Sequence, residues 1–316
     1  MRYRPLGNSG LTVSVVGLGC NNFGGRLGAD QTRAVVDAAI DVGVTLLDTA
    51  EAYGGSGRSE EVLGAALAGR RDQVVLATKF GSSGGDMGYG PAAGARGGRS
   101  YIRRAVENSL RRLRTDYIDL YQIHNPDPVT PVEETIAALT ELVRAGLVRY
   151  IGHSNFSAVQ LAAAAAAARE LNAVPFISAQ NHWSLLERAV ERDVVPAARQ
   201  FGLGVLPYFP LANGLLAGKV RRGMPPAAGT RLAARHGYIT EAKLDTVEAL
   251  ADWSQQHGRT MLEVAIGGLA AFPGCTSVIA GATSAEQVRA NAAAGDWVPE
   301  AEELAAIDKI TVAAVD

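Results

Sequence analysis

The chain has 316 residues, of which 47% are hydrophobic and 20% are charged, and its formal net charge is −2. A chain of this length can bury a sizeable core, while so small a net charge gives no general attraction to nucleic acid or to an anionic membrane. Cys20 and Cys275 are its only cysteines and no apolar run is long enough to span a membrane, so we expect a cytoplasmic protein without a disulfide framework or a metal centre.

Short apolar runs alternate with amphipathic helical stretches along the chain. After a small hairpin over residues 3–12, strands are predicted at 13–18, 45–48, 74–79, 118–124, 150–154, 178–181, 204–208 and 277–280. Helices are predicted at 31–42, 59–67, 101–113, 132–145, 158–171, 188–200, 241–257, 261–271 and 301–310. Alternation of this kind indicates strand–helix–strand units around a parallel sheet.

The number of predicted strands, each leading toward a helix, matches a closed (β/α)8 TIM barrel. The competing α/β fold is an open, doubly wound sheet that binds a dinucleotide at a glycine-rich turn. The segment at the end of the first strand carries Gly17 and Gly19 but lacks the third glycine of that motif. The sequence therefore predicts one barrel domain over residues 1–316, with a short N-terminal β-hairpin.

Polar residues stand where several of the apolar strands end. Asp48 ends the second strand and Tyr53 lies in the loop that follows it, while Lys79 and His124 end the third and fourth strands. A single polar residue at such a place more often meets solvent. In a barrel, however, the carboxyl ends of all strands surround one shared site, so these four side chains are expected to converge.

The four residue types suit one kind of chemistry. A tyrosine phenol has an ordinary pKa of about 10, and a nearby lysine ammonium lowers that pKa toward the working range of an acid catalyst. An aspartate paired with the lysine offsets the cost of burying its charge. A histidine that hydrogen-bonds a carbonyl oxygen orients the substrate. The set is therefore suited to donate a proton to the alkoxide that hydride attack on a carbonyl would form.

The sequence resembles the aldo-keto reductase superfamily over nearly its whole length. The motifs that carry the resemblance lie at residues 47–54, 77–80, 119–124, 152–156 and 279–284, each at the end of a predicted strand. The resemblance implies that Asp48, Tyr53, Lys79 and His124 form the catalytic tetrad, with Tyr53 as general acid. The details are most similar to the branch with potassium-channel β subunits and their bacterial relatives.

The same resemblance implies NADPH (NADP+) as the cofactor. Ser154, Asn155 and Gln180 match residues that bind the nicotinamide carboxamide, and Tyr208 matches the aromatic residue that stacks on the nicotinamide ring. Further matched positions lie along the pyrophosphate and the adenosine, and they are Pro210, Leu211, Asn213, Gly214, Lys219, Arg231, Gly281, Thr283, Gln287 and Asn291.

The chain departs from the family pattern at several cofactor positions. Gly281 and Gln287 stand where better-known reductases carry the lysine and arginine that grip the 2′-phosphate, and Phe209 replaces a serine. Because the segment 281–291 contains only one acidic residue, Glu286, repulsion of a 2′-phosphate is weak. We therefore expect NADPH to be preferred over NADH, with Lys219 and Arg231 carrying most of the preference.

The expected activity is reduction of an aldehyde or ketone, with a small carbonyl compound as the partner and neither nucleic acid nor membrane. A nucleotide-sensing subunit with little turnover is the alternative, while a sugar-phosphate isomerase fits the tetrad poorly. Asn21, Asn22 and Phe23 could edge the substrate pocket. Glu51 and Asp127 lie near the same end of the barrel, where a carboxylate is most often simply solvated. The substrate itself, the oligomeric state and the physiological direction do not follow from these residues.

Overall fold

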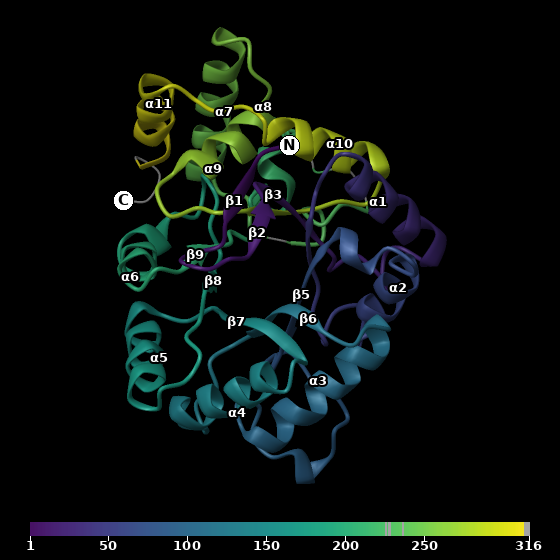
Figure 1. The fold of residues 1–316 in the computed structure, drawn as a ribbon. Coiled ribbons are helices and arrows are strands. Elements are labelled where there is room, and N and C mark those ends of the chain that lie inside the picture. The colour runs from purple at the N-terminus through teal and green to yellow at the C-terminus, as the bar shows by residue number, and fades with distance from the viewer. Residues whose placement is uncertain (225, 227–228, 236, 313–316) are drawn as a thin grey trace.

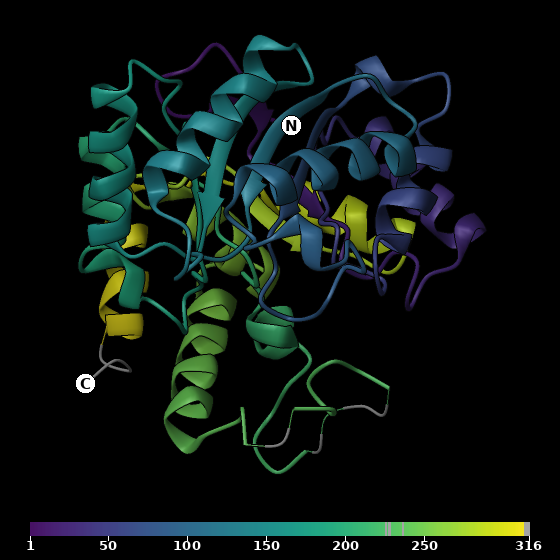
Figure 2. The ribbon, with the colours of Figure 1, turned by 90° about the horizontal axis from the view of Figure 1, so that it is seen from below.

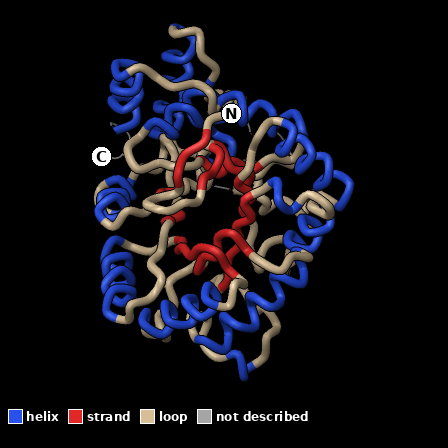
Figure 3. The backbone as a smooth tube through the Cα atoms, viewed as in Figure 1, coloured by secondary structure: helices blue, strands red, loops and turns tan. Residues whose placement is uncertain are grey.

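A ring of parallel strands forms the centre of the molecule. The computed structural model describes residues 1–224, 226, 229–235 and 237–312. The strands pair in the order β10-β3-β4-β5-β6-β7-β8-β9, and isolated bridges Val205↔Cys275 and Tyr208↔Ile279 join the two ends of this sheet. Figure 3 shows the resulting ring, which is the predicted (β/α)8 barrel. Its strands are β3 (Val16–Gly19), β4 (Leu46–Asp48), β5 (Val75–Phe80), β6 (Ile118–Ile123), β7 (Val148–Ser154), β8 (Ser178–Gln180), β9 (Gly204–Val205) and β10 (Val278–Gly281).

Helices cover the outside of the ring (Figures 1 and 2). They are α1 (Ala29–Asp41), α2 (Arg58–Ala66), α3 (Arg99–Leu113), α4 (Val132–Arg144), α5 (Ala158–Glu170), α6 (Val194–Gln200), α7 (Glu241–Gln256), α10 (Ala285–Ala294) and α11 (Ala301–Val312). The helix predicted at 261–271 consists of α8 (Met261–Glu263), a π-helical turn (Val264–Gly268) and α9 (Leu269–Ala271). In the described ranges, none of the helices is long and apolar enough to cross a membrane. The cytoplasmic location and the single-domain organisation stay predictions.

The predicted hairpin is confirmed, and it uses part of the first predicted strand. Its strands β1 (Tyr3–Pro5) and β2 (Thr12–Ser14) pair antiparallel, and the barrel strand β3 starts only at Val16. The apolar run 13–18 therefore contains two strands with different partners. At the turn, Gly7 has a φ of 58°, and a Cβ atom there would lie 2.5 Å from the carbonyl oxygen of Gly202. Only glycine tolerates this left-handed backbone and this close approach.

Two other predicted elements are shorter than expected. The strand predicted at 204–208 is limited to Gly204–Val205. The N–H groups of Leu206 and Tyr208 still donate to Ala179 and Asn181, but Pro207 has no N–H to donate on the side of β10. The helix predicted at 188–200 starts with a separate 3-10 turn, and α6 begins after Asp193, whose carboxylate accepts a hydrogen bond from the N–H of Val194 at 2.7 Å.

Apolar side chains fill the barrel interior and the space between the ring and its helices. Because successive strand residues point to opposite faces, Leu46 packs inside the barrel while Leu47 packs outside against the helices. Leu6 and Val13 of the hairpin, both 0% exposed, join the inner cluster and close its N-terminal end. Their partners in this cluster are Leu46, Ala77, Leu120, Ile177, Leu206 and Ile279. The opposite end of the barrel carries the polar side chains.

The N-terminal hairpin, which closes one end of the barrel, is expected to contribute to the stability of the fold. Because Leu6 is fully buried, Leu6→Ala leaves a cavity beneath the barrel and should lower the free energy of unfolding by about 2–5 kcal/mol. Urea denaturation followed by circular dichroism measures this change. The control Val159→Ala, on a side chain that is 79% exposed, should change it by less than about 0.5 kcal/mol. Equal stability of Leu6→Ala and wild type would contradict this stabilising role of the hairpin.

Candidate active site

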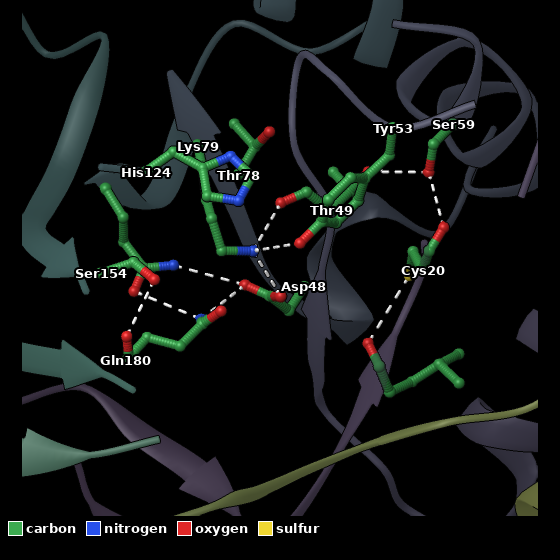
Figure 4. A network of polar contacts seen from close by, with 12 residues as sticks. Cys20, Asp48, Thr49, Tyr53, Ser59, Thr78, Lys79, His124, Ser154 and Gln180 are labelled. Atoms are coloured by element: carbon green, nitrogen blue, oxygen red, sulfur yellow. Dashed lines mark hydrogen bonds and ion pairs between the residues drawn. The ribbon is translucent and has the colours of Figure 1, made fainter. Parts of the chain in front are cut away.

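Lys79 and Asp48 form a buried ion pair at the carboxyl ends of β5 and β4. The Lys79 Nζ lies 2.6 Å from Asp48 Oδ2 and donates a second hydrogen bond to the carbonyl oxygen of Thr49 at 3.0 Å (Figure 4). Lys79 is 0% exposed and Asp48 is 3% exposed. A buried ammonium is tolerated only when its charge and its N–H donors have partners. The third partner of this ammonium is Tyr53.

Tyr53 lies in the turn after β4, with its side chain half-buried. Its phenol oxygen is 3.5 Å from Lys79 Nζ, and its ring meets that of His124 edge to face, with 5.6 Å between centroids. The turn depends on Gly54, whose φ is 71° and where a Cβ atom would lie 2.7 Å from the carbonyl oxygen of Phe23. The structure thus brings the four residues of the predicted tetrad to one end of the barrel.

The charge states of these groups differ from the sequence-based expectation at one point. Lys79 acts to lower the pKa of Tyr53 as expected, but desolvation is the larger effect and the pKa is raised above its ordinary value. The phenol therefore keeps its proton at neutral pH. Burial opposes the charge of Lys79, but Asp48 and Tyr53 outweigh it, so the pKa of Lys79 is raised and the side chain stays an ammonium.

His124 is electrically neutral. Desolvation, with a smaller contribution from the charge of Lys79, lowers the pKa of His124 to about 3. Its Nδ1 has no hydrogen-bond partner among the described residues. A neutral imidazole has one donor and one acceptor nitrogen, so it can orient a substrate oxygen without adding a second positive charge beside Lys79.

Two glutamine amides hold the other oxygen of Asp48. Gln180 Nε2 donates to Asp48 Oδ1 at 3.0 Å, and Gln122 Nε2 lies 3.3 Å from the same atom. Since an ionised carboxylate only accepts hydrogen bonds, both amides must turn their NH2 groups toward it. Gln122 was not singled out from the sequence. A polar residue in the apolar run of β6, two positions before His124 and therefore on the same face, was the available signal.

The amide cluster predicted to hold a nicotinamide is connected to the tetrad. Asn155 Nδ2 donates to the carbonyl oxygen of His124 at 2.9 Å, and its Oδ1 accepts from the Tyr208 hydroxyl at 2.8 Å. The hydroxyl of Ser154 donates to the carbonyl oxygen of Gln180 at 2.8 Å. These bonds place the end of β7, the end of β8 and Tyr208 around one polar floor next to the predicted acid.

A cavity of about 480 Å³ opens over this floor. Asp48, Tyr53 and His124 line one part of it, and Lys79 lies behind them. The predicted cofactor residues in the lining are Ser154, Asn155, Gln180, Tyr208, Pro210, Leu211, Asn213, Gly214, Arg231, Gly281, Thr283 and Gln287. Lys219 is exposed and Asn291 is 6% exposed within α10, and neither lines the cavity. The structure thus does not bring these two residues to the site.

Arginines gather at the rim of the cavity. Arg231 Nη2 donates to Asn21 Oδ1 and Asn22 Oδ1, each at 3.1 Å, and its guanidinium lies 5.3 Å from the centroid of the Phe209 ring. Arg26 also lines the cavity and donates to the carbonyl oxygen of Gly229 at 3.0 Å. In the part of the chain that the structure describes, neither arginine has a carboxylate partner, so both can meet an anion such as a phosphate.

Other residues near the cavity are placed differently from the expectation. Asn21 and Asn22 line it, but Phe23 is 0% exposed and does not. Glu51 and Asp127 are not simply solvated: Glu51 is 0% exposed, and Asp127 accepts a hydrogen bond from the N–H of Gly97 at 2.7 Å. Within the described ranges, no group of three or more His, Cys, Asp or Glu side chains is arranged to hold a metal ion.

These observations define a (β/α)8 barrel with a polar cavity at the carboxyl ends of its strands, and comparison with known proteins gives the family. The aldo/keto reductase family model matches residues 15–312, so the chain belongs to the aldo/keto reductase family. It is 40% identical over 296 residues to "Uncharacterized oxidoreductase YrpG" of Bacillus subtilis (strain 168), covering 92% of this chain and 89% of that protein. Members of the family are NAD(P)H-dependent oxidoreductases that act on small carbonyl compounds.

Two further relatives have more specific names. The chain is 33% identical over 326 residues to "L-glyceraldehyde 3-phosphate reductase" of Escherichia coli (strain K12), covering 98% of this chain and 92% of that protein. It is 35% identical over 312 residues to "Probable voltage-gated potassium channel subunit beta" of Oryza sativa subsp. japonica, with coverage of 95% and 92%. The relatives therefore include a named reductase and a named channel subunit.

His153, which precedes Ser154 in β7 and is buried against Phe156 and Phe176, gives a prediction for the pH dependence of stability. Desolvation lowers the pKa of His153 to about 3, and neither of its ring nitrogens has a hydrogen-bond partner among the described residues. The unfolded chain binds this proton below about pH 6.5 and the folded chain does not, so stability falls as the pH drops from about 6.5 toward 3. His153→Leu should reduce that loss, measured as the difference in unfolding free energy between about pH 7 and about pH 5. If the difference in unfolding free energy is the same in His153→Leu and wild type, His153 is not the source of the pH dependence.

Proposed function

We propose that the protein reduces an aldehyde or ketone with NADPH, and that Tyr53 donates the proton. The observation that carries this proposal is the position of Tyr53: its hydroxyl contacts the Lys79 ammonium at 3.5 Å, and it lines the same cavity as the amide cluster and the rim arginines. A proton donor, a neutral imidazole and an anion-binding rim in one cavity are the parts that hydride reduction of a carbonyl requires.

Different residues of the chain would hold the cofactor, orient the substrate and donate the proton. A bound nicotinamide supplies the hydride, and Ser154, Asn155 and Gln180 would hold its carboxamide. His124 donates a hydrogen bond that orients the substrate carbonyl oxygen near Tyr53. As negative charge develops on that oxygen, Tyr53 transfers its phenolic proton, and the nearby ammonium of Lys79 stabilises the phenolate that remains. Asp48 keeps Lys79 charged and in place.

The Tyr53 role is tested by one substitution. Tyr53→Phe removes the proton donor and leaves the ring, so kcat should fall roughly 100-fold or more, because a general acid contributes about 10²–10⁴. The cofactor dissociation constant, from fluorescence titration, should change by less than about twofold, a small difference in free energy. The control Tyr3→Phe, on a 50% exposed tyrosine of the hairpin, should retain wild-type turnover. Activity of Tyr53→Phe within about tenfold of wild type would remove Tyr53 from the mechanism.

The same measurements separate the enzyme from a nucleotide-sensing subunit. The similarity to a protein named as a channel β subunit favours that second possibility. A sensing subunit would bind the cofactor tightly and reduce none of a panel of aldehydes and ketones, whether NADPH or NADH is supplied. The complete set of Asp48, Tyr53, Lys79 and His124 around one cavity favours turnover, because a sensor has no need of a proton donor.

The preference for NADPH is the second part of the proposal, and Arg231 supports it. Its half-buried guanidinium stands at the cavity rim without a carboxylate partner in the described chain, held in place by Asn21 and Asn22. Because a 2′-phosphate is the only group by which NADPH differs from NADH in charge, an arginine that contacts it discriminates between the two. Thr283 and Gln287 stand in the same lining. The Thr283 hydroxyl donates to Gln287 Oε1 at 3.1 Å, so the NH2 group of Gln287 is the added donor.

Arg231→Ala should therefore weaken the binding of NADPH more than the binding of NADH. A charge-assisted hydrogen bond is worth roughly 1.5–3 kcal/mol, so the NADPH dissociation constant should rise about tenfold or more while that of NADH changes little. The control is Arg221→Ala, an exposed arginine of the same segment that does not line the cavity. Equal losses for both cofactors would mean that Arg231 does not contact the 2′-phosphate, and tighter binding of NADH by the wild type would overturn the NADPH assignment.

A further inference from the structure

A fully buried carboxylate lies two residues before the proposed acid. Glu51 is 0% exposed, although it belongs to the turn between β4 and α2 that also carries Tyr53. Its Oε1 accepts hydrogen bonds from the N–H of Gly81 at 2.7 Å and from the Tyr101 hydroxyl at 2.9 Å. Its Oε2 accepts from the Tyr89 hydroxyl at 2.9 Å. Because Glu51 has no exposed surface, it cannot contact a substrate.

The Glu51 carboxylate extends the pairing between β4 and β5 beyond the ends of both strands. The ladder ends at Asp48↔Ala77, and two backbone bonds continue it: the N–H of Thr49 donates to Ala77, and the N–H of Glu51 donates to Lys79 at 3.0 Å. The chain then turns, with the N–H of Tyr53 bonded to the carbonyl oxygen of Ala50. The next N–H on the β5 side, that of Gly81, donates to the Glu51 side chain at 2.7 Å instead of to a backbone carbonyl.

All three partners of this carboxylate are donors, which suits its ionised form. Burial raises the pKa of Glu51, while the hydrogen bonds from Gly81, Tyr101 and Tyr89 act against that rise. The pKa values of both tyrosines are raised by desolvation and by the charge of Glu51, so both phenols keep their protons and donate. Their rings meet edge to face, with 5.1 Å between centroids. A backbone N–H, a loop residue and a residue of α3 are thereby fixed to one side chain.

We infer that Glu51 is a positioning residue for Tyr53: its carboxylate fixes the turn that carries the phenol to the segment that follows Lys79, and so sets the position of the proton donor. This inference rests on the proposed role of Tyr53 as acid. The requirement is physical, because a displacement of about 1 Å at a reacting group can cost roughly 100-fold in rate. The Tyr53 hydroxyl already contacts Lys79 at 3.5 Å, so any loosening of the turn weakens that contact.

The test compares two substitutions at Glu51 with one at a matched surface position. Glu51→Ala leaves three donors without an acceptor, while Glu51→Gln keeps the shape and one carbonyl oxygen. Glu61→Gln, an exposed carboxylate on α2 close by in sequence, is the control. Turnover of benzaldehyde with NADPH is measured per cofactor-binding site, counted by fluorescence titration, so that misfolded protein does not enter the rate. The solvent isotope effect on kcat in D2O is measured in parallel.

Glu51→Ala should lower kcat roughly tenfold to 100-fold, with a cofactor dissociation constant within about twofold of wild type. The solvent isotope effect should rise, because proton transfer from a misplaced phenol becomes more nearly rate-limiting. A purely structural role would lower the number of binding sites but leave the isotope effect unchanged. Glu51→Gln should recover most of the rate, and Glu61→Gln should match wild type. If Glu51→Ala does not fold, Tyr101→Phe, which removes one donor to the carboxylate, should show a smaller change in the same direction.

Wild-type kcat and isotope effect in Glu51→Ala, or in Tyr101→Phe where that variant replaces it, would overturn the inference. Failure of the proposed function is distinguishable from this result, because it is read from Tyr53→Phe alone. An inactive Tyr53→Phe beside a fully active Glu51→Ala would retain Tyr53 as the acid and reject Glu51 as its positioning residue. An active Tyr53→Phe would reject both.

Discussion

The positive charge of Lys79, held inside the end of a barrel, constrains most of the polar structure around it. A fully buried ammonium requires a counter-ion and acceptors for its donors, and Asp48, Thr49 and Tyr53 provide them. Asp48 in turn has a second oxygen to satisfy, and the amides of Gln180 and Gln122 do so. Each group in this series satisfies the hydrogen-bonding capacity of the group before it. The buried charge of Lys79 therefore constrains side chains on β4, β6 and β8.

This dependence explains why the predicted acid and the predicted carboxamide site belong to one network. Gln180 donates to Asp48, while Asn155 donates to the carbonyl oxygen of His124 and accepts from Tyr208. A change in one group alters the hydrogen bonds available to the next, because neighbouring members of the network share their donors and acceptors. The same low-dielectric surroundings keep His124 neutral and keep the Tyr53 phenol protonated. Burial thus sets the protonation states as well as the positions.

Much of the fold could be predicted because its signals are local. Apolar runs bounded by turns and caps indicate strands and helices, and their alternation indicates a barrel. Boundaries failed where a local pattern has two explanations. The run 13–18 is continuously apolar, yet β2 pairs with the hairpin and β3 with the barrel. The run 204–208 looks like one strand, but regular pairing is limited to Gly204–Val205, and Pro207 has no N–H to donate toward β10.

The sequence by itself determined that Asp48, Tyr53, Lys79 and His124 meet, because the carboxyl ends of barrel strands face one site whatever their separation in the chain. Only the tertiary structure decided how Gln122, Glu51 and Arg26 take part. Gln122 of β6 reaches Asp48 of β4 past the intervening strand β5, Glu51 is buried against Tyr89 and Tyr101, and Arg26 meets a segment far along the chain. The net direction of the Tyr53 pKa was also decided there. Desolvation depends on how densely distant segments surround a group, and no spacing along a sequence records that density.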